Sequence, residues 1–386
     1  PSQQPTTCGG AGGVIPPIPT INYFDPDFKF EQNMKLSLGV DHRLPWGMVG
    51  TIDLLYTKTQ NSLYIQDNNL QGVADESTLT YATGEGNRAR YGVNSPTTGS
   101  ATPLKQTAAF GNVLEHRNKS DDYAFNGTIQ LQKRFSNGLE FNGGYTYSEA
   151  KDLMSLTSSI AFSNYGFATL NGLLNDRDLT TSTFSRPHRV VLSGTVNLPA
   201  DFEFSLIYSG VSGSPYGYVI NGDANADGVG GTNREFNDLV YVPRDRDDIT
   251  MFGTTPAAQN AAYDSLATFI GSQECLRNQR GQIMERNSCR NPWINRLDAR
   301  LTKLVPTFAG QTMIFSLDVF NLLNMIDSDW GLVKSTSSFE GVSMVQLRGW
   351  DQLYNRGIYS LALPIVNRVD PNSSVWRIQL GGKYIW

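Results

Sequence analysis

The chain has 386 residues, a formal net charge of −5, 39% hydrophobic residues and 37 glycines. No uninterrupted apolar run reaches the ~20 residues that a membrane-spanning helix needs, and the acidic balance argues against a nucleic-acid-binding protein. The sequence has three cysteines and three histidines, and it lacks the G-x-S-x-G, H-E-x-x-H, P-loop and C-x-x-C patterns. It therefore predicts neither an enzyme nor a protein that requires a cofactor.

Residues 1–30 are rich in proline, glycine and threonine. Residues 1–20 have neither the charged start nor the apolar centre of a secretory signal peptide. Because this segment precedes the first amphipathic strand, we expect residues 1–30 to form an extracellular loop or tail, where proteases tend to cut. Cys8 is the odd cysteine, and we expect it to pair with a cysteine outside this sequence; the alternative is a free thiol.

Nine segments of residues 31–386 alternate apolar and polar side chains, which is the pattern of a strand with one apolar and one wet face. The two residues that flank each turn must share a face, so we expect turns of odd length, with Gly47 and Gly138 in the left-handed conformation. Four hairpins and a final strand result: residues 34–56 with a turn at 45–47, 123–147 with a turn at 136–138, 190–208 with a turn at 199–201, 297–319 with a turn at 306–310, and 375–386.

The connections between the hairpins are long and rich in Gly, Ser, Asn and Asp. Short turns on one rim and long loops on the other are typical of outer-membrane β-barrels, whose turns are periplasmic and whose loops are extracellular. A soluble β-sandwich also alternates, but strands of about ten residues exceed the usual ~5–6. The fold class that we predict is all-β, an antiparallel transmembrane β-barrel.

The run Asp-Ala-Asn-Ala-Asp-Gly at residues 223–228 matches the first half of a calcium-binding loop, with oxygen ligands at alternate positions and a glycine for the turn. The second half does not match, because the acidic residue expected at the twelfth position comes one place late, as Glu235. Glu235, Asp238 and a backbone carbonyl could complete a different site. The alternative is an Asx-rich surface turn without metal. Any bound metal should be Ca²⁺, at Asp223, Asn225 and Asp227.

Cys275 and Cys289 lie in the same long connection as this motif. On the oxidising side of the cell envelope thiols tend to be paired, so we expect a disulfide between them. Two free thiols are the alternative.

Polar side chains of the last strands should face the interior of the barrel. We expect Asp298 and Asp318 to lie close together there, with Arg296 and Arg300 compensating their like charges. Arg377 belongs to the same face. These residues either line a substrate path or form an ordinary polar wall against a plug.

The final strand carries a terminal pattern of a polar residue, a glycine and two aromatics, the second of which ends the chain. It resembles the C-terminal signal by which bacterial outer-membrane barrels are recognised for assembly. The implied location is the outer membrane, with the C-terminus in the periplasm, and the implied partners are membrane lipid, lipopolysaccharide and the barrel-assembly machinery. The residues of this signal are Gln379, Gly381, Tyr384 and Trp386.

Several short motifs together resemble TonB-dependent outer-membrane receptors, and most closely their Oar-like branch. The resemblance covers essentially the whole chain, although each motif alone is weak. The motifs are Asp25-Pro26-Asp27-Phe28, Leu44-Pro45-Trp46, Ser185-Arg186-Pro187-His188-Arg189, Asn237-Asp238-Leu239-Val240-Tyr241-Val242-Pro243, Asn291-Pro292-Trp293, Leu297-Asp298 and Phe320-Asn321-Leu322-Leu323-Asn324.

This resemblance implies a barrel of 22 strands that is filled by an N-terminal plug and energised by TonB. Nine strands that end at the last one would then be strands 14–22, so we expect the plug and about thirteen strands to be supplied from outside this chain. Nine strands cannot stand alone in lipid, since both edges would leave backbone groups unpaired. The expected function is uptake of a siderophore, peptide or oligosaccharide; the alternatives are a passive porin and an adhesin or structural barrel.

Overall fold

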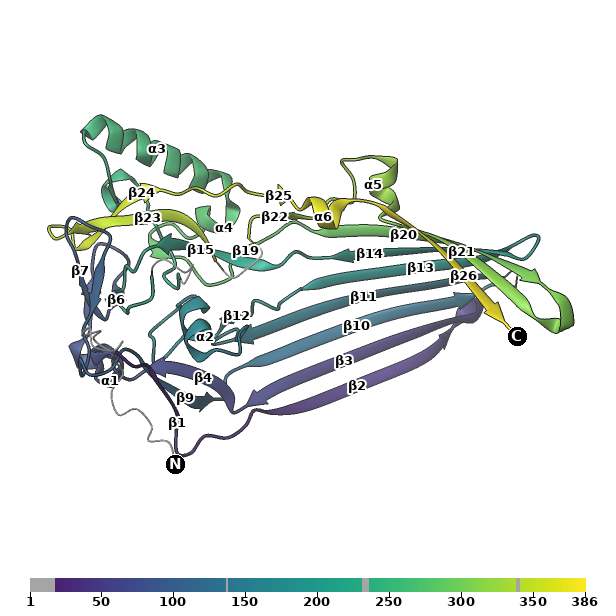
Figure 1. The fold of residues 1–386 in the computed structure, drawn as a ribbon, viewed down its shortest axis with the longest axis horizontal. Helices are drawn as coiled ribbons and strands as arrows, with labels where there is room; N and C mark the ends of the chain where they lie inside the picture. Colours follow the sequence, from purple (N-terminus) through teal and green to yellow (C-terminus); the bar gives the residue numbers. More distant parts are fainter. Residues whose placement is uncertain (1–17, 137, 231–235, 338–340) are drawn as a thin grey trace, which may run out of the picture.

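The computed structural model describes residues 18–136, 138–230, 236–337 and 341–386. Nine long antiparallel strands lie side by side in the order of the sequence and form one open, curved sheet (Figure 1). They are β2 (Gln32–Leu44), β3 (Met48–Gln60), β10 (Tyr123–Arg134), β11 (Leu139–Asp152), β13 (His188–Leu198), β14 (Phe202–Val211), β20 (Ile294–Pro306), β21 (Thr312–Phe320) and β26 (Arg377–Ile385).

Short turns join these strands at the end of the sheet that carries the C-terminus (Figure 1). Leu44 pairs with Met48 and Leu198 pairs with Phe202, so these turns have the predicted odd length. Gly47 and Gly138 adopt the left-handed conformation, with φ values of 71° and 81°.

The fourth turn differs from the expectation. Pro306 still pairs with Thr312, and the backbone N–H of Thr307 donates to the carbonyl of Gln311 at 2.8 Å. The turn therefore spans residues 307–311 rather than 306–310, because proline is tolerated at the end of a strand, where its missing N–H breaks no ladder bond. Its length remains odd.

The two faces of the sheet differ as the alternation predicts. Large apolar side chains are exposed on one face, for example Leu36 at 68%, Ile129 at 59% and Leu380 at 79%. The opposite face, here called the polar face, carries Thr51, Thr128 and Asp318 and is hollowed. Exposed apolar side chains along whole strands suit contact with lipid rather than with water.

The sheet does not close into a barrel. Within the described chain, β2 and β26 are its two edges, each paired on one side only. No helix of the described residues is both long and apolar enough to cross a membrane.

Much of the long connecting sequence folds into a compact unit beyond the other end of the strands (Figure 1). We call this unit the cap; it comprises residues 62–119, 153–182, 212–230, 236–291 and 341–361. Its elements are β4 (Ser62–Asp67), α1 (Gln71–Ala74), η2 (Glu76–Thr78), β5 (Thr80–Ala82), β6 (Arg88–Arg90), β7 (Gly92–Asn94), β8 (Ala101–Pro103), β9 (Val113–Lys119), α2 (Ala161–Phe167), β12 (Thr180–Thr181), β15 (Pro215–Asn221), β16 (Tyr241–Val242), η3 (Arg246–Asp248), β17 (Thr250–Met251), α3 (Pro256–Ser272), α4 (Glu274–Arg277), β18 (Gln282–Ile283), β19 (Cys289–Arg290), β23 (Gly341–Asp351) and β24 (Arg356–Leu361).

Further short elements lie outside the cap and the long strands. β1 runs parallel to β9 of the cap, and β22 pairs with β25. Their bounds and those of the remaining helices are β1 (Ile21–Phe24), η1 (Pro45–Gly47), η4 (Phe308–Gly310), α5 (Leu322–Ile326), β22 (Lys334–Ser335), β25 (Arg368–Val369) and α6 (Pro371–Ser374).

Two hydrophobic cores hold the cap together. One packs β15 and β23 against α3, with Tyr218, Leu239 and Leu266 fully buried. The other joins β4 and β9 to α2, with Tyr64 and Tyr165 at its centre. The sequence predicts long extracellular loops here; the structure shows instead that these connections bury their own apolar side chains and form a folded unit.

Candidate functional site

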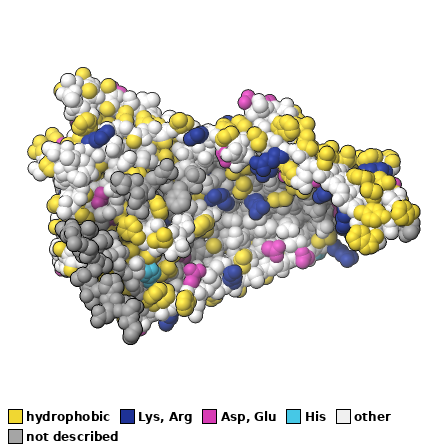
Figure 2. Space-filling model, viewed as in Figure 1, with side chains coloured by type: hydrophobic (Ala, Val, Ile, Leu, Met, Phe, Trp, Pro, Cys, Tyr) yellow, Lys and Arg dark blue, Asp and Glu magenta, His cyan; other side chains and the backbone are white. Residues whose placement is uncertain are grey.

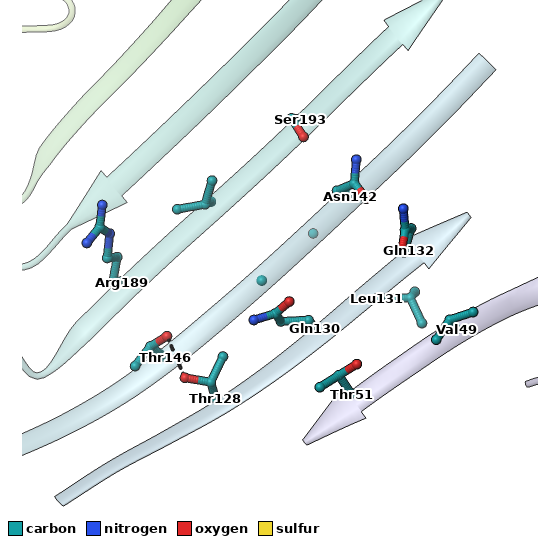
Figure 3. Close-up of a pocket in the computed structure, with 13 residues that line it drawn as sticks. Val49, Thr51, Thr128, Gln130, Leu131, Gln132, Asn142, Thr146, Arg189 and Ser193 are labelled. Atoms are coloured by element: carbon teal, nitrogen blue, oxygen red, sulfur yellow. Dashed lines mark hydrogen bonds between the residues drawn. The ribbon is translucent and has the colours of Figure 1, made fainter. Parts of the chain in front are cut away.

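The polar face begins with a hollow over β3, β10, β11 and β13 (Figure 3). Thr128 and Thr146 are opposite each other on neighbouring strands, and their hydroxyls form a hydrogen bond of 3.0 Å. Gln130, Asn142 and Arg189 line the same hollow. Because successive side chains of a strand point to opposite faces, these residues expose amide, hydroxyl and guanidinium groups along a single surface.

A larger hollow of about 910 Å³ lies farther along this face, over β13, β14, β20, β21 and β26. Arg300 pairs directly with Asp318 across the sheet, and their side chains form an ion pair of 3.3 Å. Asp298 lines the same hollow, and its carboxylate accepts a hydrogen bond of 2.8 Å from the backbone N–H of Asn321. The two acids thus share one surface, but each has its own partner.

Arg296 and Arg377 line an adjoining hollow at the ends of the strands. Arg296 donates to the carbonyl of Ser373 at 3.2 Å, and Arg377 donates to the carbonyl of Asn372 at 2.9 Å. Arg296 was expected to compensate the acids, and it instead binds the segment that leads into β26. In the pairing of β20 with β21, the residue opposite Asp318 is Arg300 and not Arg296.

The space-filling view agrees with this division of side chains. In Figure 2, hydrophobic side chains gather at the end with the C-terminus, whereas the middle of the molecule is mostly white with scattered basic and acidic groups. A wide polar surface of this kind can bind water, ions or a polar solute.

Residues Asp223 to Asp227 lie inside the cap, whereas Gly228, at the end of the loop, is exposed. Asp223, Asn225 and Asp227 are exposed by 5%, 0% and 0%. Asn237 and Asp238 are buried beside them, and Glu235 falls outside the described residues. Three or more His, Cys, Asp or Glu side chains do not form a metal-binding group anywhere in the described chain. Any metal bound to this loop would therefore need amide or backbone oxygens as well as carboxylates.

Residues 1–337 match a family model described as the outer membrane beta barrel domain. The chain belongs to this outer-membrane β-barrel family. A comparison with curated proteins found no significant match. Among solved structures, the chain is similar to the outer membrane transporter YddB from Escherichia coli, with 11% identity and a TM-score of 0.44. That match covers 95% of this chain and 34% of YddB, so the chain spans about a third of the length of that protein.

The cap of this outer-membrane protein contains the predicted disulfide. Cys275 and Cys289 are joined with an S–S distance of 2.05 Å, which links α4 to β19. Cys8 lies outside the described residues, and its pairing stays a prediction.

Aromatic side chains mark the cap end of the strands. His188 stacks on Trp293 with ring centroids 5.9 Å apart, and its Nδ1 shares a hydrogen bond of 2.8 Å with the Tyr145 hydroxyl. Both Tyr145 and Trp293 are exposed. Aromatic rings with polar edges suit the boundary between lipid and water.

At the opposite end, the residues of the predicted assembly signal lie on β26 and at its end. Gln379 and Gly381 line the polar face, whereas Tyr384 and Trp386 are exposed with ring centroids 6.3 Å apart. The Tyr384 hydroxyl donates to the side chain of Gln311, which belongs to the fourth turn. The residues of the predicted signal thus lie beside the short turns.

Two contributions to this site were not found from the sequence. The cap is one, since most of its strands have only two or three residues, too few to give a periodic pattern. The other is Arg286, which is 1% exposed and hydrogen bonds the end of β11 through Asp152. Because Arg286 lies in a polar stretch of the sequence, its local pattern does not predict that its side chain is buried.

Proposed function

We propose that this chain is the C-terminal part of the barrel of a TonB-dependent receptor that takes up a siderophore, peptide or oligosaccharide. The observation that carries the proposal is the combination of a charged, hollowed polar face with a folded cap at one end of the same strands. Recognition surfaces are commonly built from loops that a rigid scaffold holds in place. The motif resemblance to TonB-dependent receptors supports the same function.

The edges of the sheet support a larger assembly. Within the described residues β2 and β26 each have one free side, and β2 alone is 13 residues long. In lipid no water can satisfy these backbone groups, and each unpaired group costs several kcal/mol. We therefore propose that about thirteen further strands and a plug complete the receptor.

The proposed orientation follows from the two ends of the strands. The short turns and the C-terminus lie at one end and the cap at the other. In outer-membrane barrels short turns face the periplasm and long connections face outward. The cap is then the extracellular surface that meets the ligand, and TonB acts from the side of the C-terminus.

The test is a pair of measurements on the complete receptor. A soluble TonB C-terminal domain should bind the purified receptor, and deletion of the receptor's TonB-contacting segment should abolish that binding. In planar bilayers the intact receptor should show no stable open channel, because a plug fills it.

The runner-up function is a passive porin, which the continuous polar face of the sheet favours. A porin would give steady conductance and no TonB binding. An adhesin or structural barrel would give neither conductance nor TonB binding. Either result would overturn the uptake proposal.

A further inference from the structure

The loop after β15 gathers several oxygen atoms in a buried place. The Asp223 carboxylate accepts the backbone N–H groups of Asp227 at 3.0 Å and Gly228 at 2.8 Å. Asp227 Oδ1 accepts the N–H of Val229 at 2.8 Å. Left-handed backbone at Ala226 and Gly228, with φ of 57° and 90°, turns the chain sharply around these acids. Each carboxylate has four lone-pair sites, so these bonds leave capacity unused.

A second, independent observation comes from Asn237. This residue is fully buried, and its amide nitrogen reaches Asp227 Oδ2 at 2.7 Å, so the amide group is directed at the loop. Among the described residues its Oδ1 has no hydrogen-bond partner. Buried polar atoms are nearly always paired with a protein group, a water molecule or an ion, so this amide oxygen is available as a ligand for a cation beside the acids. Rotation of the Asn237 side-chain amide by 180° would place its oxygen, in place of its nitrogen, beside Asp227.

The charges of the cluster do not balance. Glu85, Asp223, Asp227 and Asp238 are all buried. Arg88 is paired with Glu85 at 3.1 Å and with Asp238 at 3.4 Å.

Asp223 and Asp227 have no cationic side chain within ion-pair distance among the described residues. Buried charges are ordinarily paired or bound to a metal, and two unpaired carboxylates match the charge of one divalent cation.

We propose that this loop binds one Ca²⁺ ion through side-chain oxygens of Asp223, Asn225 and Asp227, with Asn237 Oδ1 as a further ligand. Calcium takes six to eight oxygen ligands in flexible geometry and accepts carboxylate, amide and carbonyl oxygens together. Zinc prefers nitrogen and sulfur ligands, which the loop lacks. Magnesium demands near-ideal octahedral geometry and keeps its waters.

Asp238 has a different role, as a positioning residue. Its Oδ2 accepts the backbone N–H groups of Ala224 at 2.7 Å and Asn225 at 3.1 Å, while Arg88 occupies its Oδ1. Unlike Asp223 and Asp227, Asp238 already has a cationic partner, since Arg88 lies 3.4 Å from its Oδ1. Asp238 fixes the start of the loop from the side of β16 and does not contact the ion.

The loop is a junction of the cap, which gives the ion a structural consequence. Asn94 of β7 donates to the carbonyl of Asp223 at 2.6 Å, and the N–H of Tyr91 donates to the carbonyl of Asn225 at 2.7 Å. The loop thus ties the β6–β7 arm to β15 and β16. A bound ion holds this junction and stabilises the outer surface of the cap.

Calcium binding can be measured on the complete receptor, purified in detergent and stripped with EDTA. Isothermal titration should reveal one saturable site with a dissociation constant of roughly 10⁻⁴–10⁻³ M or tighter, the range of extracellular calcium modules. Magnesium should bind at least ~10-fold more weakly, because of its geometric demands. Terbium, a luminescent calcium substitute, should be sensitised by the buried Tyr91, whose backbone N–H donates to the carbonyl of Asn225 in the loop at 2.7 Å. A folded receptor without calcium binding or terbium emission overturns the proposal.

Variants locate the site. Asp227→Asn and Asn225→Ala should each weaken calcium binding by about 10-fold or more, and Asn237→Ala should weaken it to a smaller extent. Asp329→Asn removes one acid from an exposed turn elsewhere and serves as the control, with unchanged binding. Asn225→Ala alters no charge, so it reports on the site even if Asp227→Asn does not fold. Wild-type affinity in both loop variants overturns the proposal.

The direction in which Asp227→Asn shifts the melting temperature distinguishes a metal site from an Asx turn without metal. Calcium should raise the melting temperature of the wild-type cap by more than it raises that of Asp227→Asn at the same calcium concentration. In EDTA, Asp227→Asn should melt at or above the wild type, because the substitution removes an uncompensated buried charge. If the loop is only a hydrogen-bonded turn, calcium has no effect and Asp227→Asn melts lower than wild type in every buffer, which contradicts the proposal.

Discussion

Arg286 of the cap donates a hydrogen bond to the carboxylate of Asp152, the residue that ends β11. The same guanidinium donates to the carbonyl of Leu153 at 2.8 Å and to the hydroxyl of Ser155 at 2.9 Å. One buried side chain therefore binds the end of β11 at Asp152 and also the cap segment that follows it, at Leu153 and Ser155. This anchor explains how connections far apart in the sequence stay over the strands.

Replacing Arg286 by Met should loosen the cap while leaving the long strands intact. The Asp152 carboxylate would lose its charged partner, and breaking such a buried pair costs about 3 kcal/mol. Hydrogen exchange measured by mass spectrometry should show lost protection in residues 153–155 and 286–291. Arg286→Lys keeps the positive charge but has fewer hydrogen-bond donors in a different geometry. Its hydrogen-exchange protection should therefore be intermediate between that of the wild type and that of Arg286→Met. Unchanged protection in Arg286→Met would contradict the anchor.

Removing the disulfide should destabilise the cap locally. The bridge spans a sequence separation of 14 residues, and closing a loop of this length is worth about 3 kcal/mol in the chain-entropy model. The double variant Cys275→Ser with Cys289→Ser should show faster exchange from α4 to β19 and unchanged exchange in β20. Mass spectrometry of the non-reduced wild type, with both thiols free to alkylation, would refute the bridge itself.

Neighbouring positions of β21 provide a matched test of the two faces. Leu317 is exposed on the apolar face, and Ser316 lines the polar hollow. A lysine facing lipid near the middle of the bilayer costs about 2–4 kcal/mol, so Leu317→Lys should reduce folding stability by that amount. Ser316→Lys should change it by less than about 1 kcal/mol. Equal effects in an unfolding titration in lipid would show that the faces are misassigned.

The turn after β16 should depend on pH. Asp248 accepts hydrogen bonds from Arg244 at 3.0 and 3.1 Å, and these bonds hold its pKa at about 2, below the usual 3.8. Because the folded pKa is depressed, the carboxylate stabilises the turn above about pH 4, and this contribution is lost as the pH falls towards 2.

The measurement is the protection factor of the amides in residues 244–249, corrected for intrinsic exchange. It should fall between pH 4 and pH 2 in the wild type and be flat in Asp248→Asn. A flat profile in the wild type would rule out a role for Asp248.

The long strands could be predicted because one physical contrast dominates them. Every second side chain faces an apolar environment. Leu36 and Leu38 of β2 therefore alternate with the polar Lys35 and Ser37 in the sequence. Three turns followed from parity alone. The fourth was displaced by one residue, because the pairing of Pro306 is set by its neighbours in the ladder and not by its own missing donor.

The cap could not be predicted in the same way. Its cores combine residues from separate connections, such as Tyr64 and Tyr165, and several of its strands have two or three residues. Helix α3 did have a local signal, since Thr255 caps it and Pro256 opens it, and the alanine-rich stretch after them favours a helix. The sequence located the Asp223–Asp227 motif but not the buried position of Asn237, which only the fold brings beside it.

We propose that these nine strands are part of a larger barrel whose polar face is its interior. A cryo-electron microscopy structure of the complete protein in lipid nanodiscs would test this assembly. We expect β2 and β26 each to pair with strands from outside residues 31–386, a plug to fill the interior, and Asp298, Arg300 and Asp318 to face that plug. A barrel in which β2 pairs with β26 and nine strands enclose an empty pore would contradict it.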